Sequence, residues 1–232
     1  MGLTHSPKIV RDGLVLHLDA ANVKSYPGSG STWKDLSGYG NHGSLVADAS
    51  FSSDNKGTMN FDGTGDYVSV SSSSSINMVA DQPVTISYWM YLNQTASERS
   101  TFIGPINKNY FGRSYGHLIS PSTNGFLLYT DDDTSVEASS STVISKNKWY
   151  HVCSVYTTSK ISLYLDGELD TENSVMTGFS LTVDTNTLFI GSGSSSNYYL
   201  NGKIPIVQLY NKELSTSEIQ QNFNATRDRY GI

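Results

Sequence analysis

The feature of this sequence that most constrains its fold is a series of short apolar runs, which begins at residue 14 and continues to residue 210. Gly, Ser, Asn or Asp separates each run from the next. This spacing is typical of the strands of a sandwich or barrel, and not of alternating strands and helices. We therefore expect an all-β protein. The runs lie at residues 14–20, 58–63, 67–71, 84–92, 100–104, 116–120, 125–130, 149–156, 160–167, 187–191 and 203–210.

The totals agree with a single domain of this kind. The chain has 232 residues, within the range of one β-sandwich, and we find no internal repeat and no clear linker. It has 20 Gly and 15 Tyr, residues that suit turns and pleated surfaces. We expect one domain over residues 1–232, with a short N-terminal arm at 1–12 and a polar C-terminal tail at 224–232.

The net charge and the distribution of apolar residues limit the kinds of partner that this chain is expected to have. The net charge of -6 excludes a nucleic-acid partner, because phosphate binding needs a basic stripe and the sequence has none. Residues 1–13 lack an apolar signal core, and no apolar run approaches the ~20 residues that cross a bilayer. We expect a soluble protein made in the cytoplasm and not inserted into a membrane. The single cysteine, Cys153, lies in an apolar run and is expected to be a buried structural residue.

One helix is predicted, near the C-terminus. Ser215 is a good N-cap and Glu218 is placed to complete a capping box. Leu214 and Ile219 occupy the two positions of a hydrophobic staple, and Phe223 extends the apolar edge begun by Ile219. The helix should therefore pack on the sandwich through this edge.

The stretch "LYLDGELDTE" at residues 163–172 allows two readings. Glu168, Asp170 and Glu172 are spaced by two, which places them on one face of a strand. This row resembles the acid cluster of laminarinase-type glycosidases, and a pair of carboxylates is what glycosidic cleavage needs. However, Asp-Gly between apolar runs is also a strong sign of a β-hairpin. We interpret the stretch as a hairpin with its acids outside, and catalysis remains the alternative.

The register of this hairpin follows from keeping one face apolar. A two-residue loop would place acids opposite leucines, whereas a three-residue loop at 165–167 separates an apolar from a polar face. We therefore predict the three-residue loop. Its pairs would be Leu163 with Leu169, Ile161 with Thr171, Tyr164 with Glu168, Ser162 with Asp170, and Lys160 with Glu172.

Other motifs give weaker predictions. Pro205 interrupts the last run, so we expect that strand to lie at an edge or to carry a bulge. Asp62 and Asp66 are expected to bond their own turn. "TDDDT" at 130–134 could offer oxygen ligands to calcium, but the spaced partners of a known calcium loop are absent, so we assign no metal and no cofactor. The histidines, also without metal-ligand spacing, are His5, His17, His42, His117 and His151.

Two aromatic loops are the candidate ligand-binding sites. The segments 109–117 and 196–202 place Tyr beside Gly, Asn and Arg, a mixture that can stack on a sugar or a protein and hydrogen-bond around it. The alternative is ordinary loop tyrosine. The candidate residues are Tyr110, Tyr115, Tyr198 and Tyr199. No catalytic residue is assigned.

Several stretches in order resemble the laminin-G-like branch of the concanavalin A-like lectin/glucanase fold. They are residues 13–22, 32–43, 61–68, 84–90, 148–152, 161–169 and 201–219. The resemblance implies a two-sheet antiparallel jelly-roll sandwich whose first and last strands lie close together. Modules with this opening and this closing helix resemble those in structural proteins of bacteriophages.

We therefore expect a non-catalytic structural module of a bacteriophage virion, as a capsid decoration or a fibre-associated protein. Its partners would be other virion proteins, with cell-surface glycan and a homo-oligomer left open. The first alternative is a free carbohydrate-binding, lectin-like module. The second is a β-glucan glycosidase that uses the acids of residues 168–172.

Overall fold

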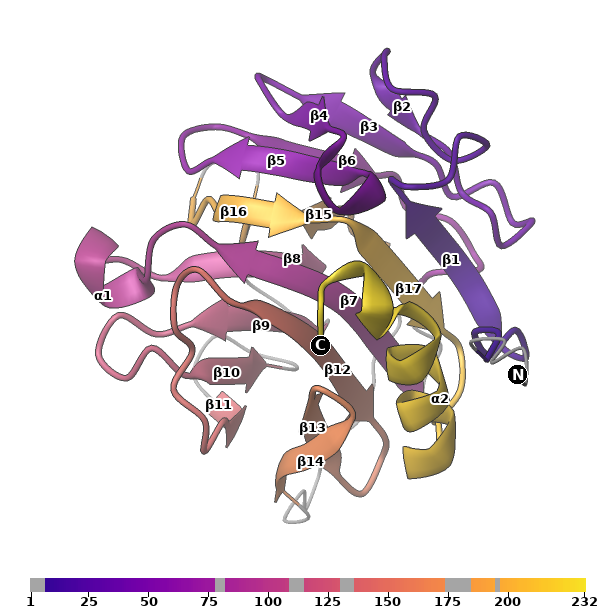
Figure 1. The fold of residues 1–232 in the computed structure, drawn as a ribbon. Helices are drawn as coiled ribbons and strands as arrows, with labels where there is room; N and C mark the ends of the chain where they lie inside the picture. The colour runs from indigo at the N-terminus through magenta and orange to yellow at the C-terminus, as the bar shows by residue number, and fades with distance from the viewer. Residues whose placement is uncertain (1–6, 78–81, 109–114, 130–135, 174–184, 195–196) are drawn as a thin grey trace, which may run out of the picture.

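The computed structural model describes residues 7–77, 82–108, 115–129, 136–173, 185–194 and 197–232. Two antiparallel sheets pack face to face, and a short helix near the C-terminus lies against one of them (Figure 1). The prediction of an all-β jelly-roll sandwich with a short C-terminal helix is confirmed. A one-turn helix, α1 (Ala96–Arg99), was not predicted, although Thr95 and Glu98 form a capping box at its start.

The first sheet, called sheet A, has nine strands in the order β14-β13-β12-β7-β16-β5-β4, with β17 also beside β7 and β1 beside β17. Its first and last strands along the chain, β1 and β17, are neighbours, as the resemblance implies. Its strands are β1 (Leu14–Asp19), β4 (Ser50–Ser52), β5 (Thr58–Asp62), β7 (Val84–Leu92), β12 (Trp149–Tyr156), β13 (Ile161–Leu165), β14 (Glu168–Asn173), β16 (Asn201–Ile204) and β17 (Ile206–Tyr210).

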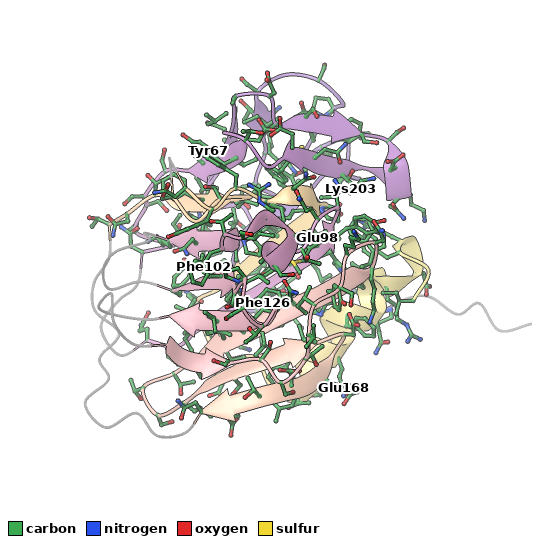
Figure 2. The ribbon with its side chains drawn as sticks, turned by 90° about the vertical axis from the view of Figure 1, so that its left-hand side faces the viewer. Tyr67, Glu98, Phe102, Phe126, Glu168 and Lys203 are labelled. Carbon is green, nitrogen blue, oxygen red and sulfur yellow. The ribbon has the colours of Figure 1, made fainter. Side chains whose placement is uncertain are left out.

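The second sheet, called sheet B, has eight strands in the order β11-β10-β9-β8-β15-β6-β3-β2. Figure 2 shows the two outer faces from the side, with Lys203 of sheet A and Tyr67 of sheet B on opposite sides of the molecule. Its strands are β2 (Thr32–Trp33), β3 (Gly43–Val46), β6 (Tyr67–Val70), β8 (Ile103–Lys108), β9 (Gly116–Ile119), β10 (Phe126–Tyr129), β11 (Val136–Ser139) and β15 (Leu188–Ile190).

The core between the sheets follows from the period-2 alternation of the strands. Alternate residues of β7 such as Ile86, Tyr88 and Met90 enter the main apolar cluster, and Val68 and Val70 meet them from sheet B. The prediction that Cys153 is buried is confirmed, and the three tryptophans are buried as well. The buried residues in question are Trp33, Trp89, Trp149 and Cys153.

Pro205 divides the last long strand. Asn201–Ile204 pairs with β5 and β7, whereas Ile206–Tyr210 pairs with β1 and β7. Pro205 falls where one partner strand is replaced by another, so its missing N–H removes no ladder bond. The segment lies inside sheet A, and the prediction of an edge strand is wrong, while an interruption at Pro205 is confirmed.

Helix α2 (Thr216–Thr226) covers part of the outer face of sheet A (Figure 1). Its capping box is formed by Ser215 and Glu218 as predicted. Phe223 packs with Trp89 and Trp149 in one apolar cluster, whereas Ile219 packs in a neighbouring one.

The residues predicted to form a polar tail also pack on this face. Thr226 ends α2, a 3-10 turn η2 (Arg227–Arg229) follows, and the buried Tyr230 ring lies 4.2 Å from the Trp89 ring. This part of the predicted polar tail therefore packs against the sandwich. The extent of the domain over the whole chain stays a prediction.

The hairpin between β13 and β14 differs from the predicted register. Its loop has two residues, Asp166 and Gly167, both with positive φ (51° and 84°), so Leu165 opposes Glu168. Asp-Gly adopts this primed turn readily, because Asp tolerates and Gly freely adopts the left-handed region. The extra residue lies instead in β14 at Asp170, where the register shifts as in a β-bulge.

The consequences for the predicted pairs are mixed. Leu169 opposes Tyr164 and is 52% exposed, so the predicted pairing of Leu163 with Leu169 is wrong. Glu172 opposes Ser162, yet Lys160 still reaches it, with Nζ 3.1 Å from Oε2. The placement of the acids outside the core is confirmed.

Gly167 offers a test of this turn. A Cβ at this position would lie 3.0 Å from Cδ1 of Phe223 and would sit on a backbone with φ +84°. We expect Gly167→Ala to lower the free energy of unfolding, measured in urea, by about 1–3 kcal/mol. Gly40→Ala is the matched control, because Gly40 has φ +77° and open space around it. Equal losses in the two variants would show that the contact with α2 contributes nothing.

Candidate functional site

An open polar groove lies on the part of sheet A that α2 leaves uncovered. It has a volume of about 380 Å³ and is formed by β5, the first residues of β4 and β16, and the segments just before β4, before β6 and after β7. In Figure 1 these strands lie above α2. We call this feature the polar groove. Its lining residues are Asp48, Ser50, Asn60, Phe61, Asp62, Asp66, Asn93 and Asn201.

Asp66 holds the acidic end of the groove together. One oxygen of its buried carboxylate accepts the backbone N–H of Asp48 at 2.9 Å, and the other accepts that of Asp62 at 3.0 Å. Asp62 in turn accepts the N–H of Thr64. Burial raises the pKa of Asp66, although the two hydrogen bonds oppose this effect. The prediction that Asp62 and Asp66 bond their own turn is confirmed.

A row of outward side chains crosses four neighbouring strands beside this end. Tyr91 pairs with Lys203, Lys203 with Asn60, and Asn60 with Ser50. Because directly paired residues share one face, these four side chains form one band. Lys203 Nζ lies 5.8 Å from the centre of the Tyr91 ring and 2.8 Å from an oxygen of Asp54. The band therefore combines an aromatic face with amide, hydroxyl and ammonium groups.

Hydrogen-bonding capacity remains at the groove wall. Asn93 donates to Asn201 Oδ1 at 3.0 Å, which leaves the Nδ2 donor of Asn201 to face outward groups. Within the described residues the exposed Asp48 carboxylate makes no hydrogen bond, and the exposed Ser50 hydroxyl makes none either. Carboxylates accept, amides donate and accept, and hydroxyls do both, which matches the alternating donors and acceptors of a polyol.

The acids of the β14 edge have structural partners. Glu172 accepts from Ser162 at 2.8 Å as well as from Lys160, and the Ser162 bond in first place lowers its pKa. Asp170 accepts the backbone N–H of Ser141 at 2.8 Å and that of Thr142 at 3.1 Å, and both hydroxyls also donate to it. Asp170 thus ties β14 of sheet A to the loop after β11 of sheet B.

The candidate tyrosines have different surroundings. Tyr110 lies outside the described residues. Tyr115 is only 1% exposed, packs against Tyr156 and donates to the carbonyl of Ile76, so its prediction as a ligand-facing loop residue is wrong. Tyr198 and its neighbour Tyr199 are half-buried, and the Tyr198 ring meets Phe102 edge-on at 5.5 Å. A ligand role for these last two stays a prediction.

Metal sites are not formed by the described residues. No group of three or more His, Cys, Asp or Glu side chains in that part of the chain is arranged to hold an ion. The acidic run at 131–133 lies outside it. In the same part, no helix is long and apolar enough to cross a bilayer.

Two buried histidines resemble catalytic bases in their partners but not in their location. His117 contacts the Ser154 hydroxyl at 2.6 Å and the Tyr88 hydroxyl at 2.7 Å, and His151 contacts the Ser87 hydroxyl at 2.8 Å. His117 is wholly buried between the sheets, and His151 is buried under α2. Without access for a substrate, these pairs are structural.

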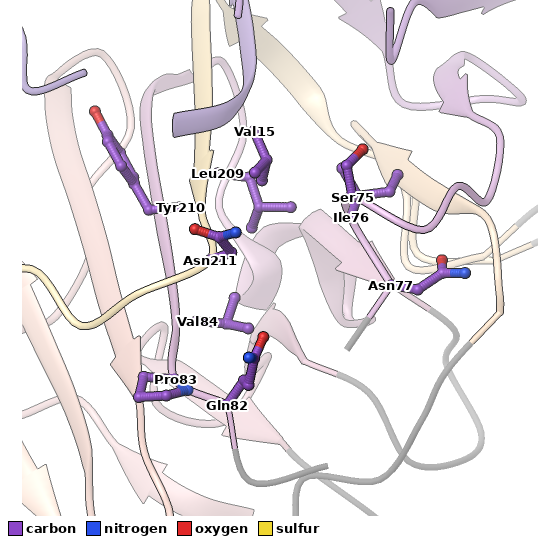
Figure 3. Close-up of a pocket in the computed structure, with 10 residues that line it drawn as sticks. All are labelled: Val15, Ser75, Ile76, Asn77, Gln82, Pro83, Val84, Leu209, Tyr210 and Asn211. Carbon is purple, nitrogen blue, oxygen red and sulfur yellow. The ribbon is translucent and has the colours of Figure 1, made fainter. Parts of the chain in front are cut away.

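One further cavity lies where β7 begins and β17 ends (Figure 3). Its volume is about 10 Å³, close to the roughly 10–15 Å³ that a single water requires. Val15, Ile76 and Leu209 give it an apolar wall. It is therefore a packing defect of the core and not a ligand site.

Sequence reasoning found the turn at Asp62 and Asp66 but missed the groove. The groove residues come from segments that are up to about 150 positions apart, and only the pairing of β4, β5, β16 and β7 brings them together. The local signal was Asp62, Asn93 and Asn201 at or beside the ends of their strands, and such residues also suit ordinary turns.

The architecture recurs in solved structures at low sequence identity. The binding domain of Paraclostridial Mosquitocidal Protein 1 matches with a TM-score of 0.73 and 16% identity, over 93% of this chain and 52% of that one. The botulinum neurotoxin serotype D ligand binding domain in complex with N-acetylneuraminic acid matches with 0.71 and 17%, over 92% and 51%. Trypanosoma rangeli sialidase matches with 0.66 and 17%, over 94% and 33%.

These matches show the fold alone. The chain spans about half, or less, of the length of the chains it matches. The shared fold occurs both in binding domains and in a sialidase, so it is compatible with binding and with catalysis. No curated protein sequence matches the chain.

The family is shown by a sequence match over more than half of the chain. Residues 62–220 match the laminin-G-type model described as the concanavalin A-like lectin/glucanases superfamily. This stretch begins at the groove residue Asp62 and ends within α2, and it includes both strands of the acidic hairpin. The chain belongs to the concanavalin A-like lectin/glucanase superfamily.

Proposed function

We propose that this protein is a non-catalytic glycan-binding module and that the polar groove holds the glycan. The observation that carries the proposal is the groove itself, an open space of about 380 Å³ with carboxylate, amide and hydroxyl groups on β4, β5 and β16 and on the adjoining loops. Side chains on strands keep their positions better than those on loops, and a sugar needs such fixed partners. The lectin-like fold of the family agrees with this function.

The charges of the groove indicate the class of glycan. Asp48 and Asp62 bring two carboxylates that are not paired with a cation among the described residues. An acidic sugar would place a further negative charge beside them and beside Asp66, which is unfavourable. Neutral hydroxyls can instead donate to these carboxylates and accept from the amides of Asn60 and Asn201. The ligand is therefore a neutral saccharide.

A double variant tests the groove. Asp48→Ala with Asn60→Ala removes one acceptor and one amide, and we expect the affinity for a neutral oligosaccharide to fall about tenfold or more. Hits would first be found on a glycan array and their affinities then measured by calorimetry. Thermal unfolding would check that the double variant remains folded, because Asn60 also accepts a hydrogen bond from Thr58.

The matched control removes two polar side chains from the other sheet. Ser44 and Ser69 point outward on paired positions of β3 and β6 in sheet B. Ser44→Ala with Ser69→Ala should bind the same glycan as the wild type. Loss of binding in the control, or no neutral glycan bound by the wild type, would contradict the proposal.

The proposal that the module is non-catalytic rests on the acids of β14. A general acid in a glycosidase needs a raised pKa, whereas Glu172 has its pKa lowered and Asp170 is occupied by Ser141 and Thr142. We expect no release of reducing sugar from β-glucan by the wild type. Turnover that disappears in Glu168→Gln would instead establish the glycosidase alternative.

The virion role stays a prediction from the sequence resemblance. If the module is carried on a bacteriophage particle, it should be present in fixed stoichiometry in particles purified on a density gradient, and mass spectrometry of such particles would measure this. If the groove binds glycan but the protein is absent from the particles, the free lectin-like alternative is favoured.

A further inference from the structure

A second cleft lies where the N-terminal segment, β1 and the end of α2 meet. Its volume is about 190 Å³, more than ten times the roughly 10–15 Å³ that one water requires. It is separate from the polar groove and shares no lining residue with it. The lining side chains that carry charge or hydrogen-bonding groups are Lys8, Arg11, His17, Asp19, Thr226 and Arg229.

The cleft is basic although the chain as a whole has a net charge of -6. Lys8, Arg11 and Arg229 bring three cations, against the carboxylate of Asp19. Both oxygens of Asp19 accept from Nη1 of Arg229, at 2.9 and 3.0 Å, and one of them also accepts the N–H of Ala21. Asp19 therefore neutralises Arg229, and the charges of the other two cations remain.

The acids nearest in sequence do not neutralise these two cations. Asp12 follows Arg11 directly, but its carboxylate binds Lys212 at 2.8 Å. Glu218, on the first turn of α2, also binds Lys212. Among the described residues neither Lys8 nor Arg11 forms a salt bridge. Lys8 and Arg11 are both exposed and line the same open cleft, and two cations so placed repel each other unless an anion lies between them.

The walls of the cleft add donors that are already positioned. Asp19 engages only Nη1 of Arg229, so the Nη2 end of this planar guanidinium is outside the pair. Burial lowers the pKa of His17, so its ring is neutral near pH 7 and carries one N–H donor. The backbone N–H of His17 is bound to Asp35 at 2.8 Å, which fixes the residue on β1.

We propose that this cleft binds a tetrahedral oxyanion, a phosphate or sulfate group, with Lys8 and Arg11 as the charged donors and His17 and Arg229 at the wall. The group is either a free ion or an ester on a saccharide, and both present the same oxygens. Arginine is suited to this task because its planar donors match two oxygens of one anion. Asp19 keeps the Arg229 guanidinium in place.

The test uses the whole chain and two probes. Calorimetry would measure the binding of inorganic phosphate at constant ionic strength set with chloride, and the binding of dextran sulfate compared with unsulfated dextran. We expect Lys8→Gln with Arg11→Gln to weaken binding of the active probe by about tenfold or more. Phosphate binding indicates a free ion, and binding of dextran sulfate alone indicates an ester.

The matched control also removes two positive charges, but at positions outside the cleft. Lys24 and Lys34 are exposed, do not line the cleft and form no salt bridge among the described residues. Lys24→Gln with Lys34→Gln should leave the affinity as in the wild type. The proposal is wrong if neither probe binds the wild type, or if the two double variants lose the same affinity. Neither set touches the polar groove, so a failure here leaves the glycan proposal standing.

Discussion

Trp89→Ala is expected to lower the free energy of unfolding by about 3–5 kcal/mol. The Trp89 ring is 1% exposed and lies 4.2 Å from the Tyr230 ring and 5.8 Å from that of Phe223, between sheet A and α2. Its Nε1 also donates to the Thr226 hydroxyl at 2.8 Å. Alanine would remove the apolar surface on which the C-terminal segment packs and would leave a cavity.

Urea unfolding followed by circular dichroism would measure this loss, and hydrogen exchange would locate it. Relative to the wild type, hydrogen exchange in Trp89→Ala should increase more for the amides of α2 than for the amides of sheet B. Tyr39→Ala is the control, because Tyr39 is 59% exposed and its removal should cost little. A loss below about 1 kcal/mol for Trp89→Ala would show that α2 does not depend on this ring.

The second large effect is a loss of stability in acid. Burial lowers the pKa of both His117 and His151 to about 3. In the unfolded chain their rings take up protons below about pH 6.5, so the unfolded state binds more protons between that pH and about 3. Stability is therefore full above about pH 6.5 and falls as the pH is lowered, by about 1 kcal/mol per pH unit for each histidine.

The variant His117→Gln isolates one of the two contributions. Glutamine can still hydrogen-bond but does not titrate, so the slope of unfolding free energy against pH between 6.5 and 4 should be smaller than in the wild type. Ser154→Ala is the matched control, since it removes the same 2.6 Å hydrogen bond from the other side and keeps the imidazole. An unchanged slope in His117→Gln would contradict the account.

The fold was predictable where the signal is local. The capping box of Ser215 and Glu218 and the apolar alternation of β7 depend on residues close in sequence, and both were read correctly. The hairpin register was not predicted correctly, because two registers are compatible with the same pattern of apolar residues. One places the extra residue in the loop and the other places it at Asp170, where the structure has it and where Ser141 and Thr142 of the loop after β11 bind the carboxylate.

The candidate site was less predictable for the same reason. The sequence around Tyr115 has the composition of a loop, yet the Tyr115 ring, just before β9, packs against Tyr156 of β12, about 40 positions further along the chain. The buried hydrogen bonds of His117 join β9 of sheet B to β7 and β12 of sheet A. No spacing of residues in the sequence predicts them. The packing of Tyr115 and the hydrogen bonds of His117 form only when the two sheets pack against each other.

The bulge at Asp170 also bears on how copies of this protein behave in concentrated solution. β14 lies at one edge of sheet A. A straight edge strand is a template on which another chain can add a strand. The shifted register disrupts this ladder, and Glu168 adds an exposed carboxylate to it, whereas the charge of Glu172 is paired with Lys160. We therefore expect the hairpin that resembled a catalytic cluster to disfavour edge-to-edge pairing of two copies.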